Sequence, residues 1–232
     1  MEAPQVRFSF RALWRTVTRQ HKAELGLIAL VTLVLLVFTF TRTRNTTNTR
    51  SRIITVERLV EKGTMAHVAP GDTTPFALSI DAAMVDGKLY SSKPPNYPFV
   101  MAAQAWVMRK VTGWAFYPHR KDYIRMLTIV NQVLPYAALL VLLLLFTRFY
   151  TADRFTLVFV ILMASVGSLV YGYAVTINNH TPAAIGFFIA FFLAWLILQQ
   201  GRTAWWYYAL FGLVASYAST IDLPGGAIAG IL

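Results

Sequence analysis

The chain has 232 residues, of which 56% are hydrophobic and only 13% are charged, with a formal net charge of +11. A typical soluble domain carries about 25% charged residues, because a folded domain must cover its surface with polar groups. The composition therefore excludes an ordinary soluble protein and predicts an integral membrane protein in contact with membrane lipids. No basic cluster lies on a soluble module, so nucleic acid is not an expected partner.

The first 23 residues are polar and basic, and an apolar run, ELGLIALVTLVLLVFTF, follows at 24–40. Such a run is either a cleaved signal peptide or an uncleaved signal anchor. No small-residue cleavage pattern comes after it, so we expect an anchor that forms the first membrane span.

Four more apolar runs approach the roughly 20 residues that cross the hydrocarbon core of a bilayer. They lie at 126–146, 155–175, 182–198 and 204–218. With the first run they predict five spans, and a sixth is expected to start near Leu223 and to be cut off by the end of the chain. We therefore expect an all-α polytopic transmembrane helical bundle of five to six spans, with most of it in residues 124–232. A C-terminal remainder, on the same or another chain, is an expected partner.

The basic residues predict how the chain is oriented. Arg148, Arg154 and Arg202 lie in or beside two of the short loops, whereas the alternate loops at 177–181 and 219–226 hold no Lys or Arg. Cytoplasmic loops carry the excess of Lys and Arg. The N-terminal segment 1–23 is therefore expected in the cytoplasm of a plasma (inner) membrane, and the large loop 41–123 on the extracytoplasmic side.

Three elements are expected inside the large loop. The Thr-, Arg- and Asn-rich stretch 42–52 is expected to be a flexible or extended connector. The next stretch, ITVERLVEKGT, predicts a short helix that ends at Gly63, because Gly commonly closes helices. The run Phe99–Val111 is too short and too charged at its end to span, so it predicts a helix at the membrane surface.

The segment SIDAAMVDGKLYSSKPPNYP holds the first candidate site residues. Asp86-Gly87 is a turn signal, and a chain reversal there would bring Asp81 toward Tyr90 and Lys93. A carboxylate in the mostly apolar stretch around Asp81 is suited to act as a general base or to stabilise positive charge, although a loop-capping role is equally compatible with its position.

Lys93 precedes Pro94-Pro95, which bias its backbone to an extended conformation. A Lys held in this way near a membrane surface suits a lipid phosphate, although a solvated Lys beside Pro-Pro is also ordinary.

A second polar group, Asn178-Asn179-His180-Thr181-Pro182, joins two predicted spans on the same side. His180 is suited to act as an acid, a base or a ligand, whereas Thr181 before Pro182 is expected to be a helix N-cap. Asn131 and Gln132 lie in the second predicted span and are expected to face the bundle interior. The sequence holds no paired-His or DxD motif, so it does not indicate a metal site.

The order of these motifs resembles the N-terminal part of the GT-C superfamily of polytopic glycosyltransferases, above all its bacterial protein mannosyltransferase and aminoarabinose transferase members. These proteins show an acidic residue and an Arg after the first span, then G-x-x-Y-x-x-KPP, then an Arg that opens the second span. The matching residues lie within roughly residues 25 to 200, and they are Glu57, Arg58, Gly87, Tyr90, Lys93, Pro94, Pro95 and Arg125.

The resemblance implies transfer of a sugar from a polyprenyl-phosphate donor to an acceptor on the extracytoplasmic face, with no metal or other cofactor. It implies that a carboxylate of the first outer loop activates the acceptor. The family's paired Asp-Glu is missing, which leaves Asp81 as the first candidate for the base and Glu57 as the second. The donor phosphate is expected at Lys93, Arg58 and Arg125. Further substrate contacts are expected from Tyr90, Asn179 and His180.

Two other functions use the same residues. A transporter or flippase of a lipid-linked or anionic solute would use the basic residues without chemistry, but the repeats and broken helices typical of transporters are not visible in the sequence. Family members have about eight to thirteen spans, so a non-catalytic membrane fragment is the third possibility.

Overall fold

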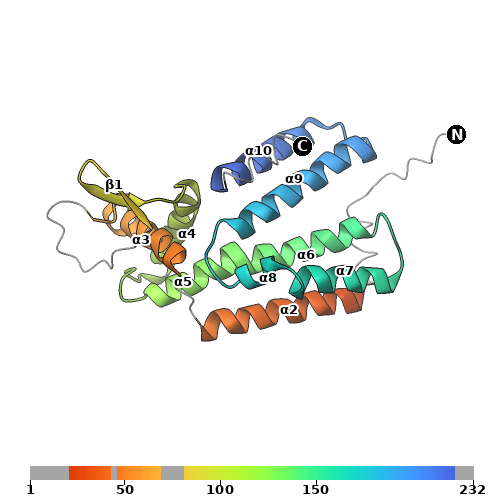
Figure 1. Ribbon diagram of the computed structural model, residues 1–232, viewed down its shortest axis with the longest axis horizontal. Coiled ribbons are helices and arrows are strands. Elements are labelled where there is room, and N and C mark those ends of the chain that lie inside the picture. Colours follow the sequence, from red (N-terminus) through yellow and green to blue (C-terminus); the bar gives the residue numbers. More distant parts are fainter. Residues whose placement is uncertain (1–20, 43–45, 69–80, 223–232) are drawn as a thin grey trace.

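The computed structural model describes residues 21–42, 46–68 and 81–222. In this part of the chain, a set of long helices runs side by side and a smaller group of elements caps one end of the set (Figure 1). The predicted sixth span near Leu223 and residues 1–20 of the N-terminal segment lie outside the described residues.

Three helical stretches of the described residues are long and apolar enough to cross a membrane. They are α2 (Lys22–Thr41), the continuous stretch Arg120–Thr147 and α9 (His180–Gln200). The middle stretch consists of α5 (Arg120–Thr128), the π-helical turn η1 (Ile129–Val133) and α6 (Leu134–Thr147). These stretches correspond to the first, second and fourth predicted spans, so the structure supports a polytopic helical membrane protein.

The other two predicted spans differ from expectation. The run 155–175 divides into α7 (Arg154–Val166) and the short helix α8 (Leu169–Tyr173), separated at Gly167 and Ser168. The Ser168 hydroxyl donates to the Ala164 carbonyl oxygen (2.8 Å), so a side chain takes part in the helical hydrogen bonding at the break. The last described helix, α10 (Trp205–Ile221), packs along α9 and is 17 residues long.

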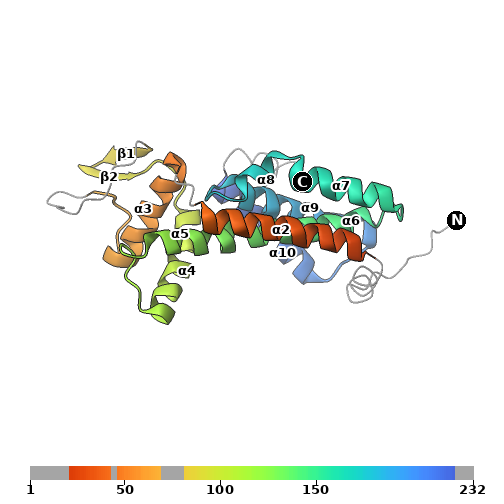
Figure 2. The same cartoon turned by 90° about the horizontal axis from the view of Figure 1, so that it is seen from below.

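The cap at the end of the bundle is formed by α3 (Thr47–Lys62), α4 (Asn96–Thr112) and an antiparallel hairpin of β1 (Ala82–Val85) and β2 (Lys88–Ser91) (Figures 1 and 2). The hairpin makes the expectation of an all-α fold wrong in this region. The expectation of an irregular connector over 42–52 is wrong from Thr47 onward.

Helix α3 begins early because Thr46 caps it. The Thr46 side chain accepts a hydrogen bond from the backbone N–H of Thr49 (3.2 Å), which satisfies one of the donors that an uncapped helix would leave free. The helix ends as predicted at Gly63, whose φ of 67° lies in the left-handed region.

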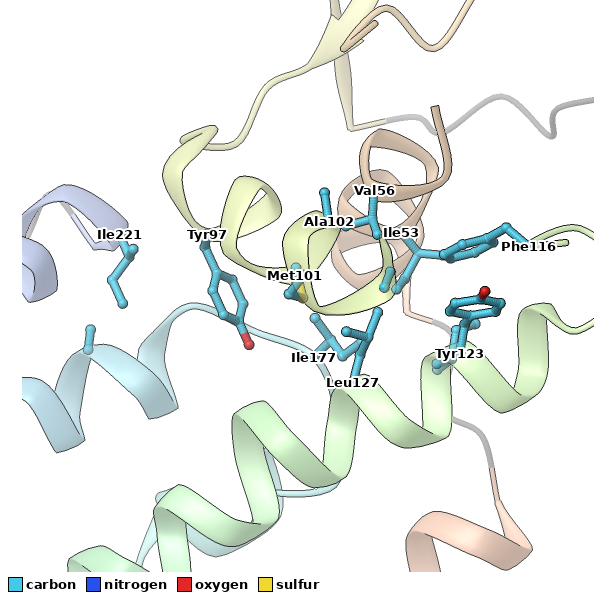
Figure 3. Close-up of a cluster of buried hydrophobic side chains, with 13 residues drawn as sticks. Ile53, Val56, Tyr97, Met101, Ala102, Phe116, Tyr123, Leu127, Ile177 and Ile221 are labelled. Atoms are coloured by element: carbon cyan, nitrogen blue, oxygen red, sulfur yellow. The ribbon is translucent and has the colours of Figure 1, made fainter. Parts of the chain in front are cut away.

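The cap is fixed to the bundle by a cluster of buried apolar side chains (Figure 3). Ile53 and Val56 of α3 meet Met101 of α4, and Leu127 of α5 and Ile177 of the loop before α9 complete the contact. Burial of each large aliphatic side chain contributes about 1.5–3 kcal/mol, so this cluster holds the polar groups of the cap over the ends of the long helices.

Buried amides join the same elements. Gln132 donates to the hydroxyl of Tyr97 (2.7 Å) and to the Asn178 carbonyl oxygen (2.9 Å), and Asn131 exchanges hydrogen bonds with Gln104. The prediction that Asn131 and Gln132 face the interior is confirmed. Their π-helical turn is a local widening of the helix of the kind often found at functional sites.

Helix α4 covers the predicted surface helix Phe99–Val111 and extends beyond it at both ends. Its buried face includes Met101 and Ala105, whereas Trp106, Val107 and Val111 are exposed. The prediction of a helix is confirmed, and its position at a membrane surface stays a prediction.

Candidate functional site

The β1–β2 hairpin brings the first two candidate residues together. Asp86 (φ 49°) and Gly87 (φ 71°) form its turn with left-handed backbones, and Ala82 pairs with Ser91. This register places Asp81 beside Lys93, whose Nζ lies 3.0 Å from Asp81 Oδ2. The predicted approach of Asp81 to Lys93 is confirmed.

Asp81 is stabilised in its ionised form. Burial raises the pKa of this carboxyl, but hydrogen bonds from Ser92 and Lys93 and the positive charges of Lys93 and Arg52 outweigh burial and hold the pKa below its usual value. The carboxylate is therefore a stable partner for Lys93 across the neutral pH range.

The base of the hairpin is attached to α3. The Ser51 hydroxyl donates to the Asp81 carbonyl oxygen (2.8 Å) and lies 2.7 Å from the Ser91 hydroxyl. The Ser91 hydroxyl in turn accepts the backbone N–H of Lys93 (3.2 Å). These bonds fix the backbone on both sides of the Asp81–Lys93 ion pair.

A cavity of about 150 Å³ opens beside Lys93. Lys93 is the only cationic side chain among its described lining residues, which are Thr55, Met65, Tyr90, Ser91, Lys93, Pro95 and Pro98. Both Tyr90 and Lys93, which the sequence places in one motif, thus line the same cavity. Its size and single cation suit one phosphate group.

A buried histidine contacts Thr55, one of the residues that line this cavity. His67 Nε2 lies 2.8 Å from the Thr55 hydroxyl, and burial together with the charge of Arg58 lowers the pKa of His67 to about 4. His67 is therefore neutral at physiological pH and leaves Lys93 as the charge at the cavity.

Arg52 connects the hairpin to the second polar group, and sequence reasoning missed it. Its buried guanidinium donates to Asn179 Oδ1 (2.5 Å) and to the Asn48 carbonyl oxygen (3.2 Å). Burial lowers the pKa of Arg52, while Tyr97, Asp81 and Asp222 raise it, so Arg52 lies within electrostatic range of carboxylates from two parts of the chain. Arg52 was not predicted because residues 42–52 are expected from the sequence to be an irregular connector, whereas Arg52 lies on α3.

The second polar group forms a histidine–carboxylate pair. His180 Nδ1 lies 2.9 Å from Oδ2 of Asp222, which directly follows α10. The adjacent Asn178 accepts the backbone N–H of Thr181 through Oδ1 (2.9 Å). The N-cap residue of α9 is Asn179, which makes no side-chain cap hydrogen bond, and Thr181 lies within the helix, so the expectation that Thr181 would cap it is wrong.

The remaining predicted residues lie in other surroundings. Glu57 is 1% exposed and faces Arg120 of α5, with a distance of 3.4 Å between Oε2 and Nε. Arg58 is buried and donates to the Ala66 carbonyl oxygen (3.0 Å). Arg125 pairs with Asp122 of its own helix (3.2 Å). The structure thus unites Asp81, Lys93 and Tyr90, and it gives Glu57 a structural partner instead.

Burial is the largest influence on Glu57. It raises the pKa of this carboxyl, and Arg120 opposes it. Neither carboxylate oxygen has a hydrogen-bond partner, so the ion pair with Arg120 is the main polar contact of this side chain among the described residues. Within the part of the chain that the structure describes, Glu57 is therefore buried and paired with Arg120.

No protein-family model, curated protein or solved structure matches the chain. Among residues 21–42, 46–68 and 81–222, no group of three or more His, Cys, Asp or Glu side chains is arranged to hold a metal ion.

Proposed function

We propose that the chain is a membrane glycosyltransferase of the GT-C type, which moves a sugar from a polyprenyl-phosphate donor to an acceptor on the extracytoplasmic face. The observation that carries the proposal is that Lys93, held in an ion pair by Asp81, lines a cavity together with Tyr90. Tyr90 and Lys93 belong to the GKLYSSKPP segment on which the resemblance mainly rests.

Lys93 is the residue we assign to the donor phosphate. Its ammonium group is a compact charge, which suits a phosphate oxygen, and it is 29% exposed. Asp81 holds the ammonium group at the cavity until the phosphate arrives. When the sugar is transferred, Lys93 stabilises the negative charge that develops on the departing phosphate.

The proposed orientation follows the positive-inside rule. The cap, the start of α9 and the end of α10 lie at one end of the helices, as the contacts Arg52–Asn179 and His180–Asp222 require (Figure 1). The basic loops with Arg148 and Arg202 belong to the other end. We place the cap on the extracytoplasmic side of the plasma membrane, with the N-terminus in the cytoplasm.

The test supplies radiolabelled polyprenyl-phosphate sugars to membranes that contain the full chain and follows loss of label from the lipid. Wild type is expected to transfer sugar. Lys93→Ala is expected to lower transfer at limiting donor by about tenfold or more, the equivalent of about 1.4 kcal/mol of binding. Asp81→Asn is expected to lower it through misplacement of Lys93.

Lys88→Ala is the matched control, since Lys88 is an exposed lysine on the same hairpin and pairs with Val85 beside the turn. Equal transfer by wild type, Lys93→Ala and Lys88→Ala would show that the Lys93 cavity does not bind the donor phosphate. Donor binding without any transfer by wild type would favour a flippase or a non-catalytic fragment.

A further inference from the structure

The proposed reaction must move a proton from the acceptor hydroxyl, and the Lys93 cavity does not supply a good proton acceptor. Asp81 already accepts hydrogen bonds from Ser92 and Lys93 and is paired with the Lys93 charge. A carboxylate stabilised in this way gains little from taking up a proton. The inference that follows rests on the proposed function and concerns which side chain takes this proton.

His180 has the geometry of an oriented base. Its side chain is 58% exposed, whereas that of its partner Asp222 is 16% exposed. The 2.9 Å contact uses Nδ1, so Nε2 lies on the other edge of the ring. A carboxylate that accepts the Nδ1 proton fixes the tautomer in which Nε2 has a free lone pair, and it stabilises the imidazolium that forms when Nε2 is protonated.

The histidine pair is connected through α3 to the base of the hairpin beside Lys93. Consecutive residues of α3 make the two connections, because Ser51 bonds to Asp81 and Arg52 bonds to Asn179, the residue before His180. Arg52 also interacts electrostatically with both Asp81 and Asp222. One buried guanidinium therefore sets the position of the start of α9 relative to the hairpin.

We propose that His180 is the proton acceptor of the reaction and that Asp222 and Arg52 are its positioning residues. The acceptor oxygen forms a bond to the anomeric carbon of the donor sugar, and the bond from that carbon to the phosphate oxygen breaks. The electron pair of the broken bond leaves with the polyprenyl phosphate, and the acceptor proton passes to His180 Nε2. No oxidant, reductant or metal is needed for this balance.

Several described groups surround the His180–Asp222 pair. Asp222 faces His180 from the end of α10, Arg52 reaches Asn179 from α3, and the Tyr173 ring of α8 packs edge-on at 6.0 Å between ring centroids. The N-terminus of α9 disfavours a cation, while Asp222 favours one.

The test measures kcat and the KM for the donor for the full chain in membranes. His180→Gln is expected to lower kcat by about 100-fold or more, with little change in KM. Asp222→Asn is expected to lower kcat, and Asp222→Glu to recover part of it. Asp81→Asn is expected to act mainly on KM.

A second measurement covers the case in which His180→Gln does not fold. Added imidazole is expected to restore part of the transfer by His180→Ala, which a merely structural histidine would not allow. Transfer by wild type together with an unchanged kcat in His180→Gln would overturn the assignment and leave the proposed function standing. No transfer by wild type would overturn both.

Discussion

The fold keeps the buried side chain of His67 neutral at physiological pH. Its pKa is about 4 in the folded chain, compared with about 6.5 in an unfolded one. As the pH falls, the unfolded chain therefore takes up a proton on His67 before the folded chain does. The contribution of neutral His67 to the free energy of unfolding is complete above about pH 6.5 and is lost as the pH falls toward 4. The difference corresponds to about 3 kcal/mol.

We expect the melting temperature of the detergent-solubilised chain to fall between pH 7 and pH 4.5, and His67→Gln to flatten this dependence. His119→Gln is a suitable control, because His119 lies in a half-exposed position at the start of α5. An identical pH dependence in wild type and His67→Gln would show that another group is responsible.

Glu57 allows a second test at a single residue. Because its carboxylate is closed off and paired with Arg120, we expect Glu57→Gln to change the stability of the chain but not the KM for the donor or the pH profile of transfer. A loss of transfer by the folded variant, measured in the same radiolabel assay, would restore Glu57 as a catalytic candidate.

Local turn chemistry explains which site residues could be predicted. Asp86-Gly87 specifies a hairpin turn without help from the rest of the fold, and the hairpin fixes the approach of Asp81 to Lys93. Arg52 and Asp222 could not be found in this way. Their relation to the site depends on how α3, α9 and α10 pack, which short-range patterns do not determine.

At the level of elements, Glu61 joins α3 to the segment between α4 and α5. Its carboxylate accepts the backbone N–H of the buried Phe116 (2.7 Å) and a hydrogen bond from Arg109 (2.9 Å). Glu61→Ala leaves that N–H unsatisfied, which costs about 1–3 kcal/mol. We expect the melting temperature to fall in Glu61→Ala and to stay unchanged in Lys62→Ala, whose side chain is exposed.

The pairing of α9 with α10 depends on a small residue. A Cβ added at Gly186 would lie 2.8 Å from the Ala218 Cβ, so Gly186→Ala forces the two helices apart and is expected to cost about 1–3 kcal/mol. Gly212→Ala is the control, because its added Cβ meets nothing within 4 Å. Thermal unfolding in detergent measures both, and equal melting temperatures would contradict the close packing of α9 on α10.

Helix existence could be predicted from hydropathy, but helix continuity could not. The strongly apolar runs 24–40, 126–146 and 182–198 correspond to long helices. The run 155–175 is equally apolar, but it breaks at Gly167–Ser168. The mean hydropathy of a run of about 20 residues does not reveal such a break, because the break depends on the backbone hydrogen bonds of one or two residues.

The whole molecule has two polar ends, and their assignment to the two sides of a membrane can be tested directly. The chain has no cysteine, so single cysteines can be introduced without a modified background. In sealed cells, a membrane-impermeant maleimide is expected to label Lys88→Cys on the hairpin and to leave Thr203→Cys in the α9–α10 loop unlabelled until the membrane is opened. The reverse pattern would invert the proposed orientation.

The proposed function depends most on Lys93 as the site of a lipid-linked phosphate. Binding of polyprenyl phosphate to the purified chain in detergent tests this directly, because it requires neither the sugar nor the acceptor to be known. We expect wild type and Lys88→Ala to bind with equal affinity and Lys93→Ala to bind about tenfold or more weakly. Equal affinity in all three proteins would contradict the proposed site.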